Sequence, residues 1–104
     1  MSVQATNTFR TRPGRAAQLI ATLQQVLPDT LTHGGCEEIR IWHDQDDADT
    51  VVSATRWTTR RDYEAYLEWR HGTGDTAMFR EMLTQDMEVR YYDEVFAIAS
   101  GPQP

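Results

Sequence analysis

The stretch GGCEEIRIWHDQDDADTVVSATRWTTRRDYEAYLEWRH, residues 34–71, carries the clearest local patterns in this chain of 104 residues. Two runs typical of β-strands, Cys36–His43 and Thr50–Trp57, flank the acidic segment Asp44–Asp49. Strand-like runs separated by a short polar segment are typical of a β-hairpin. The central part of the chain is therefore predicted to be a pair of adjacent antiparallel strands.

The hairpin is followed by helical patterns. Thr58 or Thr59 can cap the next helix, and Thr59 with Asp62 resembles a capping box. We expect Gly72–Gly74 to end this helix and a short helix to begin at Asp75 or Thr76. The apolar residues expected on one face are Tyr63, Tyr66 and Leu67 in the first helix, and Met78, Phe79, Met82 and Leu83 in the second.

Upstream of the hairpin, Val3–Arg10 alternates like a strand, and Arg12–Gly14 has the composition of a turn. A helix should follow, because Ala16, Leu19, Ile20, Leu23, Val26 and Leu27 recur at helical spacing. We expect Pro28 to kink this helix or to start a second short one, and Leu31 to continue its apolar stripe.

Downstream, Met87–Ile98 is predicted to be the last strand, bent near Asp93. The resulting order is strand, helix, strand, strand, helix, short helix, strand. This order indicates an α+β fold of the ferredoxin-like, split βαβ type, with an antiparallel sheet. We expect a single domain over residues 1–99 and a flexible tail over residues 100–104.

Composition excludes several classes of function. The chain has 16 acidic and 10 basic residues, a formal net charge of −6, which does not suit binding to nucleic acid or to an anionic membrane surface. All basic residues are Arg, which removes Schiff-base chemistry. Cys36 is the sole cysteine, and the three histidines lack metal-ligand spacing, so no metal site is predicted. No apolar run approaches the roughly 18 residues of a transmembrane helix, and the N-terminus lacks the apolar region of a signal peptide. A cytoplasmic location is therefore expected.

Helices in this topology cover one face of the sheet only. The opposite face is expected to carry Arg10, Trp42, Arg56, Arg90 and Tyr92. This mixture of aromatic and charged side chains suits neither open solvent nor a dry core. A homodimer formed by sheet-to-sheet packing would cover it.

Residues 34–71 also resemble the antibiotic biosynthesis monooxygenase family. The shared features are Gly35–Cys36 before a strand, the acidic turn Asp44–Asp49, and Trp57 at the end of the next strand. Tyr63 on the following helix and then His71 complete the pattern. The Arg-Pro-Gly turn and the closing MEVRYYDEV also fit, so the resemblance extends over about Val3–Phe96.

This resemblance implies a dimeric α/β barrel, in which each subunit has a pocket between its sheet and its helices. Many family members are cofactor-independent monooxygenases that convert an aromatic polyketide such as an anthrone into a quinone with O2. Others degrade haem, and others bind or isomerise small molecules.

Asn7 is an unusual residue for its position. It falls among Val3, Ala5 and Phe9 on the face expected under the helices, where a buried amide requires hydrogen-bond partners. It either bonds to neighbouring backbone or orients a ligand or O2. The resemblance favours the second role, because quinone-forming and haem-degrading relatives both use an Asn on the first strand.

Trp57 either packs in the core or stacks on a planar substrate and offers it the indole N–H. Some quinone-forming relatives carry an Asn four residues before this Trp. Here that position is Ser53, which can donate a hydrogen bond over a shorter reach. Tyr63 is either a core aromatic residue or a proton donor to a peroxy intermediate, and Tyr66, one turn later, can point into the same space.

His71 is expected in a loop after the helix. Imidazole suits proton abstraction at neutral pH, although a lone loop histidine is often a surface residue. Haem-degrading relatives use a His near here as the iron ligand, with a Trp where this chain has Tyr66. Arg80 matches an Arg of some quinone-forming members and either holds a phenolate or carboxylate or forms a surface ion pair.

The predicted function is therefore oxidation of an aromatic polyketide of the anthrone or hydroquinone type to a quinone, with O2 as co-substrate and no cofactor. Asn7 and Trp57 would orient the substrate, and His71 or Tyr63 would move protons. The alternatives are haem degradation, with haem held by His71, and a non-catalytic dimeric module that binds a small molecule.

Overall fold

The computed structural model describes residues 2–101, so Met1 and residues 102–104 of the predicted tail lie outside the described residues. The elements are β1 (Val3–Arg10), α1 (Ala16–Val26), the 3-10 helix η1 (Leu27–Thr32), β2 (Cys36–His43), β3 (Thr50–Trp57), α2 (Arg60–Thr73), α3 (Asp75–Met82) and β4 (Glu88–Asp93). Across the described part of the chain, none of the helices is both long and apolar enough to cross a membrane.

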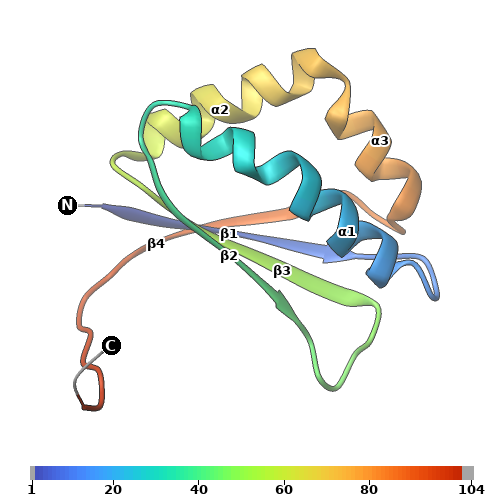
Figure 1. The fold of residues 1–104 in the computed structure, drawn as a ribbon, viewed down its shortest axis with the longest axis horizontal. Coiled ribbons are helices and arrows are strands. Elements are labelled where there is room, and N and C mark those ends of the chain that lie inside the picture. The colour runs from blue at the N-terminus through green and yellow to red at the C-terminus, as the bar shows by residue number, and fades with distance from the viewer. Residues whose placement is uncertain (1, 102–104) are drawn as a thin grey trace.

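The four strands form one antiparallel sheet in the order β2-β3-β1-β4. The helices lie together on one face of this sheet, and no element covers the other face within residues 2–101 (Figure 1). This arrangement confirms the predicted ferredoxin-like α+β fold. Trp42 and Tyr92, two aromatic residues expected on the open face, are half exposed, at 53% and 49%.

The core lies between the sheet and the helices because the sheet alternates its side chains between two faces. One cluster forms around α1, with the buried residues Phe9, Ala16, Leu19, Leu23, Val51, Met82 and Leu83. A second cluster, under α2, consists of Ala5, Trp57, Tyr63 and Tyr66. The apolar stripe predicted for α1 therefore faces the sheet.

The prediction for the end of α1 was partly wrong. A 3-10 helix with Pro28 in its first turn follows α1 directly, as one of the two alternatives expected. Leu31 does not continue the apolar stripe, because the tighter turn of this helix leaves its side chain 53% exposed.

The predicted stop of α2 within Gly72–Gly74 is confirmed, whereas the predicted end of the last strand needs correction. Helix α2 continues through Gly72 to Thr73, and Gly74 ends it with a positive φ of 86°. Strand β4 ends at Asp93, where its pairing with β1 stops, instead of continuing to Ile98. The segment beyond it exposes three large apolar side chains, Val95, Phe96 and Ile98.

Gly35 permits close contact between the start of β2 and α2. Its φ is +94°, and a Cβ at this position would lie 2.5 Å from a carboxylate oxygen of Asp62. The same residue accepts a backbone hydrogen bond from Thr58, just before Thr59 caps α2. The hairpin and the helix after it are thereby fixed relative to each other.

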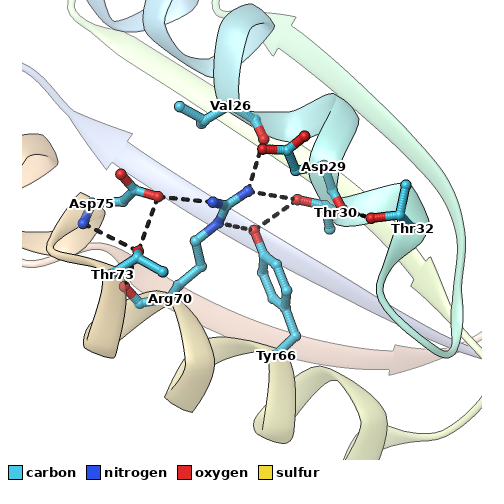
Figure 2. Close-up of polar contacts among 8 residues, drawn as sticks. All are labelled: Val26, Asp29, Thr30, Thr32, Tyr66, Arg70, Thr73 and Asp75. Carbon is cyan, nitrogen blue, oxygen red and sulfur yellow. Dashed lines mark hydrogen bonds and ion pairs between the residues drawn. The ribbon is translucent and has the colours of Figure 1, made fainter.

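Arg70 on α2 links the helical elements of the covered face (Figure 2). Its guanidinium is buried and donates to the hydroxyls of Tyr66 and Thr30 and to the carbonyl oxygen of Val26. It also forms an ion pair of 2.8 Å with Asp75. One side chain thus connects the end of α1, η1, α2 and the start of α3.

We expect Arg70→Ala to destabilise the fold by about 3–5 kcal/mol, because it leaves the partners of a buried cation unsatisfied. Urea unfolding followed by circular dichroism measures this free energy. The matched control is Arg40→Ala, whose ion pair with Glu38 is more exposed and should contribute less than about 1 kcal/mol. Equal losses in the two variants would contradict a structural role for the buried guanidinium.

Candidate functional site

A cavity of about 300 Å³ lies between the sheet and the helices. This volume is at the lower end of the range typical of small-molecule sites. The apolar part of its wall consists of Phe9, Leu23, Val26, Leu27, Leu67, Phe79, Leu83, Met87 and Val89. Its polar residues are Asn7, Thr30, Ser53, Thr55, Tyr63, Tyr66, Arg70, His71, Thr76, Arg80 and Asp86.

The first polar group on the cavity wall is centred on Asn7. The β1–β3 register places Asn7 directly opposite Ser53, and both side chains are buried. Ser53 Oγ donates to Asn7 Oδ1 at 3.3 Å, so the amide nitrogen faces the other way. That nitrogen donates to the Tyr63 hydroxyl and, at 3.1 Å, to Met87 Sδ. Asn7 is thus held by side chains from β3, from α2 and from the segment before β4.

The hydroxyl of Tyr63 is placed as a hydrogen-bond donor in this environment. Burial disfavours the charged phenolate and raises the pKa of Tyr63 far above its ordinary value near 10. The hydroxyl oxygen already accepts the Asn7 bond, and among the described residues no acceptor is found for its proton. Tyr63 can therefore donate a hydrogen bond into the cavity at neutral pH, and it cannot act as a general base there.

Trp57 lies behind this group, away from the cavity. It is fully buried, and its indole N–H donates to Thr55 Oγ1 at 2.8 Å. Its ring packs against Tyr63 and Tyr66 with centroid distances of 5.3 and 5.1 Å. The expectation that Trp57 offers its N–H to substrate is corrected by this geometry, because the donor is used and the side chain supports the two tyrosines.

His71 and Arg80 lie on the exposed part of the cavity wall. His71 was predicted in a loop, but α2 extends to Thr73, so His71 occupies the last turn of the helix. Arg80 forms the surface ion pair that was one of its two expected roles, 3.3 Å from Asp86. The structure thus places Asn7, Ser53 and Tyr63 together deep in the cavity, and His71 and Arg80 at its mouth.

Tyr66 belongs to a second polar group, which includes two residues that the sequence did not single out. Its hydroxyl accepts from Arg70 at 2.8 Å and lies 2.8 Å from Thr30 Oγ1. Arg70 follows Tyr66 by four residues and therefore lies on the same face of α2. An arginine on this otherwise apolar face could have been used to predict a buried cation. The role of Thr30 could not be predicted in this way, because its side chain bonds to Tyr66 and Arg70, which are 36 and 40 residues away in sequence.

Candidate metal ligands do not gather in the described part of the chain. Across residues 2–101, no group of three or more His, Cys, Asp or Glu side chains is placed to hold a metal ion.

Similar folds are found among solved structures. SnoaB, a cofactor-independent oxygenase from Streptomyces nogalater, aligns with a TM-score of 0.79 and 14% identity, over 93% of this chain and 96% of that protein. A putative antibiotic biosynthesis monooxygenase from Deinococcus radiodurans has a TM-score of 0.78 and 17% identity, over 96% and 99%. One from Bordetella bronchiseptica has a TM-score of 0.75 and 18% identity, over 91% and 98%.

These identities establish similarity of fold. A comparison with curated proteins finds no match. The sequence profile of the antibiotic biosynthesis monooxygenases matches residues 2–72, which is more than half of the chain. The chain therefore belongs to the antibiotic biosynthesis monooxygenase family.

Proposed function

We propose that the protein is a cytoplasmic, cofactor-independent monooxygenase that oxidises an anthrone- or hydroquinone-like aromatic polyketide to a quinone. The observation that carries this proposal is the buried Ser53–Asn7–Tyr63 group, in which the Tyr63 hydroxyl is held with its proton available to the cavity. The fold that the chain shares with a cofactor-independent oxygenase supports it. For a substrate methylene, one oxygen atom of O2 becomes the carbonyl oxygen, and the other leaves as water with the two methylene hydrogens.

The reaction begins with loss of a proton from the substrate. The carbanion passes one electron to O2, and recombination of the two radicals gives a peroxide. Cleavage of the O–O bond with loss of the second C–H proton yields the carbonyl and releases water. The protein contributes desolvation, orientation and proton transfer.

Each polar residue has a proposed part in these steps. Tyr63 donates a hydrogen bond to the developing oxyanion or peroxide, because its raised pKa keeps the hydroxyl protonated. Asn7 donates to that hydroxyl and holds it in place, and Ser53 in turn donates to Asn7. His71, at the cavity mouth, accepts the first proton, and Arg80 attracts an anionic substituent of the substrate.

Tyr63→Phe should lower O2 uptake with an anthrone substrate by about 100-fold or more, because it removes only the proposed hydrogen-bond donor. Asn7→Ala should cause a similar loss by freeing the Tyr63 hydroxyl. The measurement is O2 consumption by metal-stripped protein above the spontaneous rate. Tyr92→Phe, which removes an exposed hydroxyl on the other face of the sheet, is the control. Undiminished uptake by Tyr63→Phe would refute the proposed role.

The two alternatives give different results in companion experiments. A non-catalytic binding module would bind anthrones or hydroquinones and show no O2 uptake with any of them. A haem-degrading enzyme would bind the haem iron through His71 at the cavity mouth. In that case a haem titration would show a Soret shift that His71→Ala removes.

The raised pKa of Tyr63 also predicts a dependence of stability on pH. The phenol ionises near pH 10 in the unfolded chain and at higher pH in the folded chain. Its contribution to stability is therefore complete below pH 10 and is lost as the pH rises above 10. Urea unfolding at pH 8 and pH 10.5 should show a smaller decrease in unfolding free energy for Tyr63→Phe than for the parent protein. An equal decrease would show that Tyr63 ionises normally.

We also propose that the open face of the sheet forms a homodimer. Trp42 and Tyr92 supply the exposed aromatic surface, and Val95, Phe96 and Ile98 add apolar side chains beyond β4. Trp42→Glu should convert a dimer into a monomer in analytical ultracentrifugation, because it places charge at a buried apolar contact. Leu31→Glu, at an equally exposed apolar residue on η1, should leave the dimer intact. A monomeric parent protein would exclude this interface.

A further inference from the structure

The Tyr66–Thr30 pair forms a second hydrogen-bonding position in the cavity, separate from Tyr63. Tyr66 comes from α2 and Thr30 from η1, and both side chains are buried and line the cavity. Figure 2 shows the two hydroxyls meeting beside the Arg70 guanidinium. The Tyr63 hydroxyl, by contrast, is held from the sheet by Asn7. The cavity therefore has one polar position on its sheet side and one on its helix side.

The Tyr66–Thr30 pair leaves one proton unused. Arg70 donates to the hydroxyl oxygens of both residues, at 2.8 Å to Tyr66 and 3.1 Å to Thr30. The two hydroxyls also share one hydrogen bond of 2.8 Å, in which either can be the donor. Two hydroxyl protons are thus available for one shared bond. Whichever residue accepts that bond has a proton left to donate elsewhere, and the charged guanidinium strengthens this donor.

We infer that the cavity binds a flat aromatic molecule with two hydrogen-bond-accepting oxygens, one held by Tyr63 and the other by the Tyr66–Thr30 pair. The identification of this molecule with the substrate or product rests on the proposed function, whereas the two-donor binding site does not. Such a ligand is a diketone or a related oxygenated polycyclic compound. The remaining cavity wall is mainly apolar, which suits its ring system.

Two probes of nearly equal shape test this inference. Anthraquinone carries two opposed carbonyl oxygens, whereas anthrone carries one, with a methylene at the other position. Binding is measured anaerobically, so that anthrone is not oxidised, by quenching of tryptophan fluorescence. The parent protein should bind anthraquinone about two- to tenfold more tightly than anthrone, the value of one additional hydrogen bond.

The variants give a distinctive pattern. Tyr66→Phe and Thr30→Val should each retain the preference for anthraquinone, because the remaining hydroxyl still has a free proton. The double variant Tyr66→Phe/Thr30→Val should lose the preference. Tyr63→Phe should also lose it, which provides a second test if the double variant does not fold. The control is Thr22→Val/Tyr92→Phe, two hydroxyl deletions outside the cavity lining, which should retain the preference.

The remaining outcomes overturn the inference. They are no preference in the parent protein, a preference that survives in the double variant or in Tyr63→Phe, and no binding of either probe. Two-donor binding without O2 uptake would instead leave the binding site established and exclude the proposed monooxygenase reaction.

Discussion

A buried arginine holds the helical layer of this protein together. A cation removed from water is tolerated only when its N–H groups find partners, and Arg70 finds them on three different helical elements and at the start of α3. These bonds define the positions of the C-terminal ends of α1 and α2 relative to each other. The cavity lies between these helices and the sheet, so its shape depends on the same contacts.

The two polar groups of the cavity illustrate different ways of satisfying buried polar atoms. On the sheet side, strand register places Asn7 opposite Ser53, and the amide transmits this constraint to Tyr63. On the helix side, a full charge organises two hydroxyls. In both groups the protein's own donors occupy the hydroxyl oxygens and leave one hydroxyl proton without an acceptor among the described residues. Such preorganised donors require little rearrangement when negative charge develops on oxygen.

The fold could be predicted from the sequence because its signals are local. Strand alternation, the acidic turn and the Thr59 cap gave β1, β2 and β3 with their observed bounds and the start of α2 within one residue. Alternation also placed Asn7 correctly under the helices. Features that depend on tertiary contacts were harder to predict. The environment of Trp57 depends on Thr55 and two tyrosines, and the end of β4 depends on where its pairing with β1 stops.

The Arg70 contacts join residues that are distant in sequence. The Tyr66–Thr30 and Arg70–Val26 bonds span 36 and 44 residues. Closing such loops carries an entropic cost, so contacts of this kind are expected late in folding, after the local helices and the hairpin have formed. Interactions that form after the transition state slow unfolding and have little effect on the folding rate. The buried guanidinium should therefore determine chiefly how long a folded molecule persists before it opens.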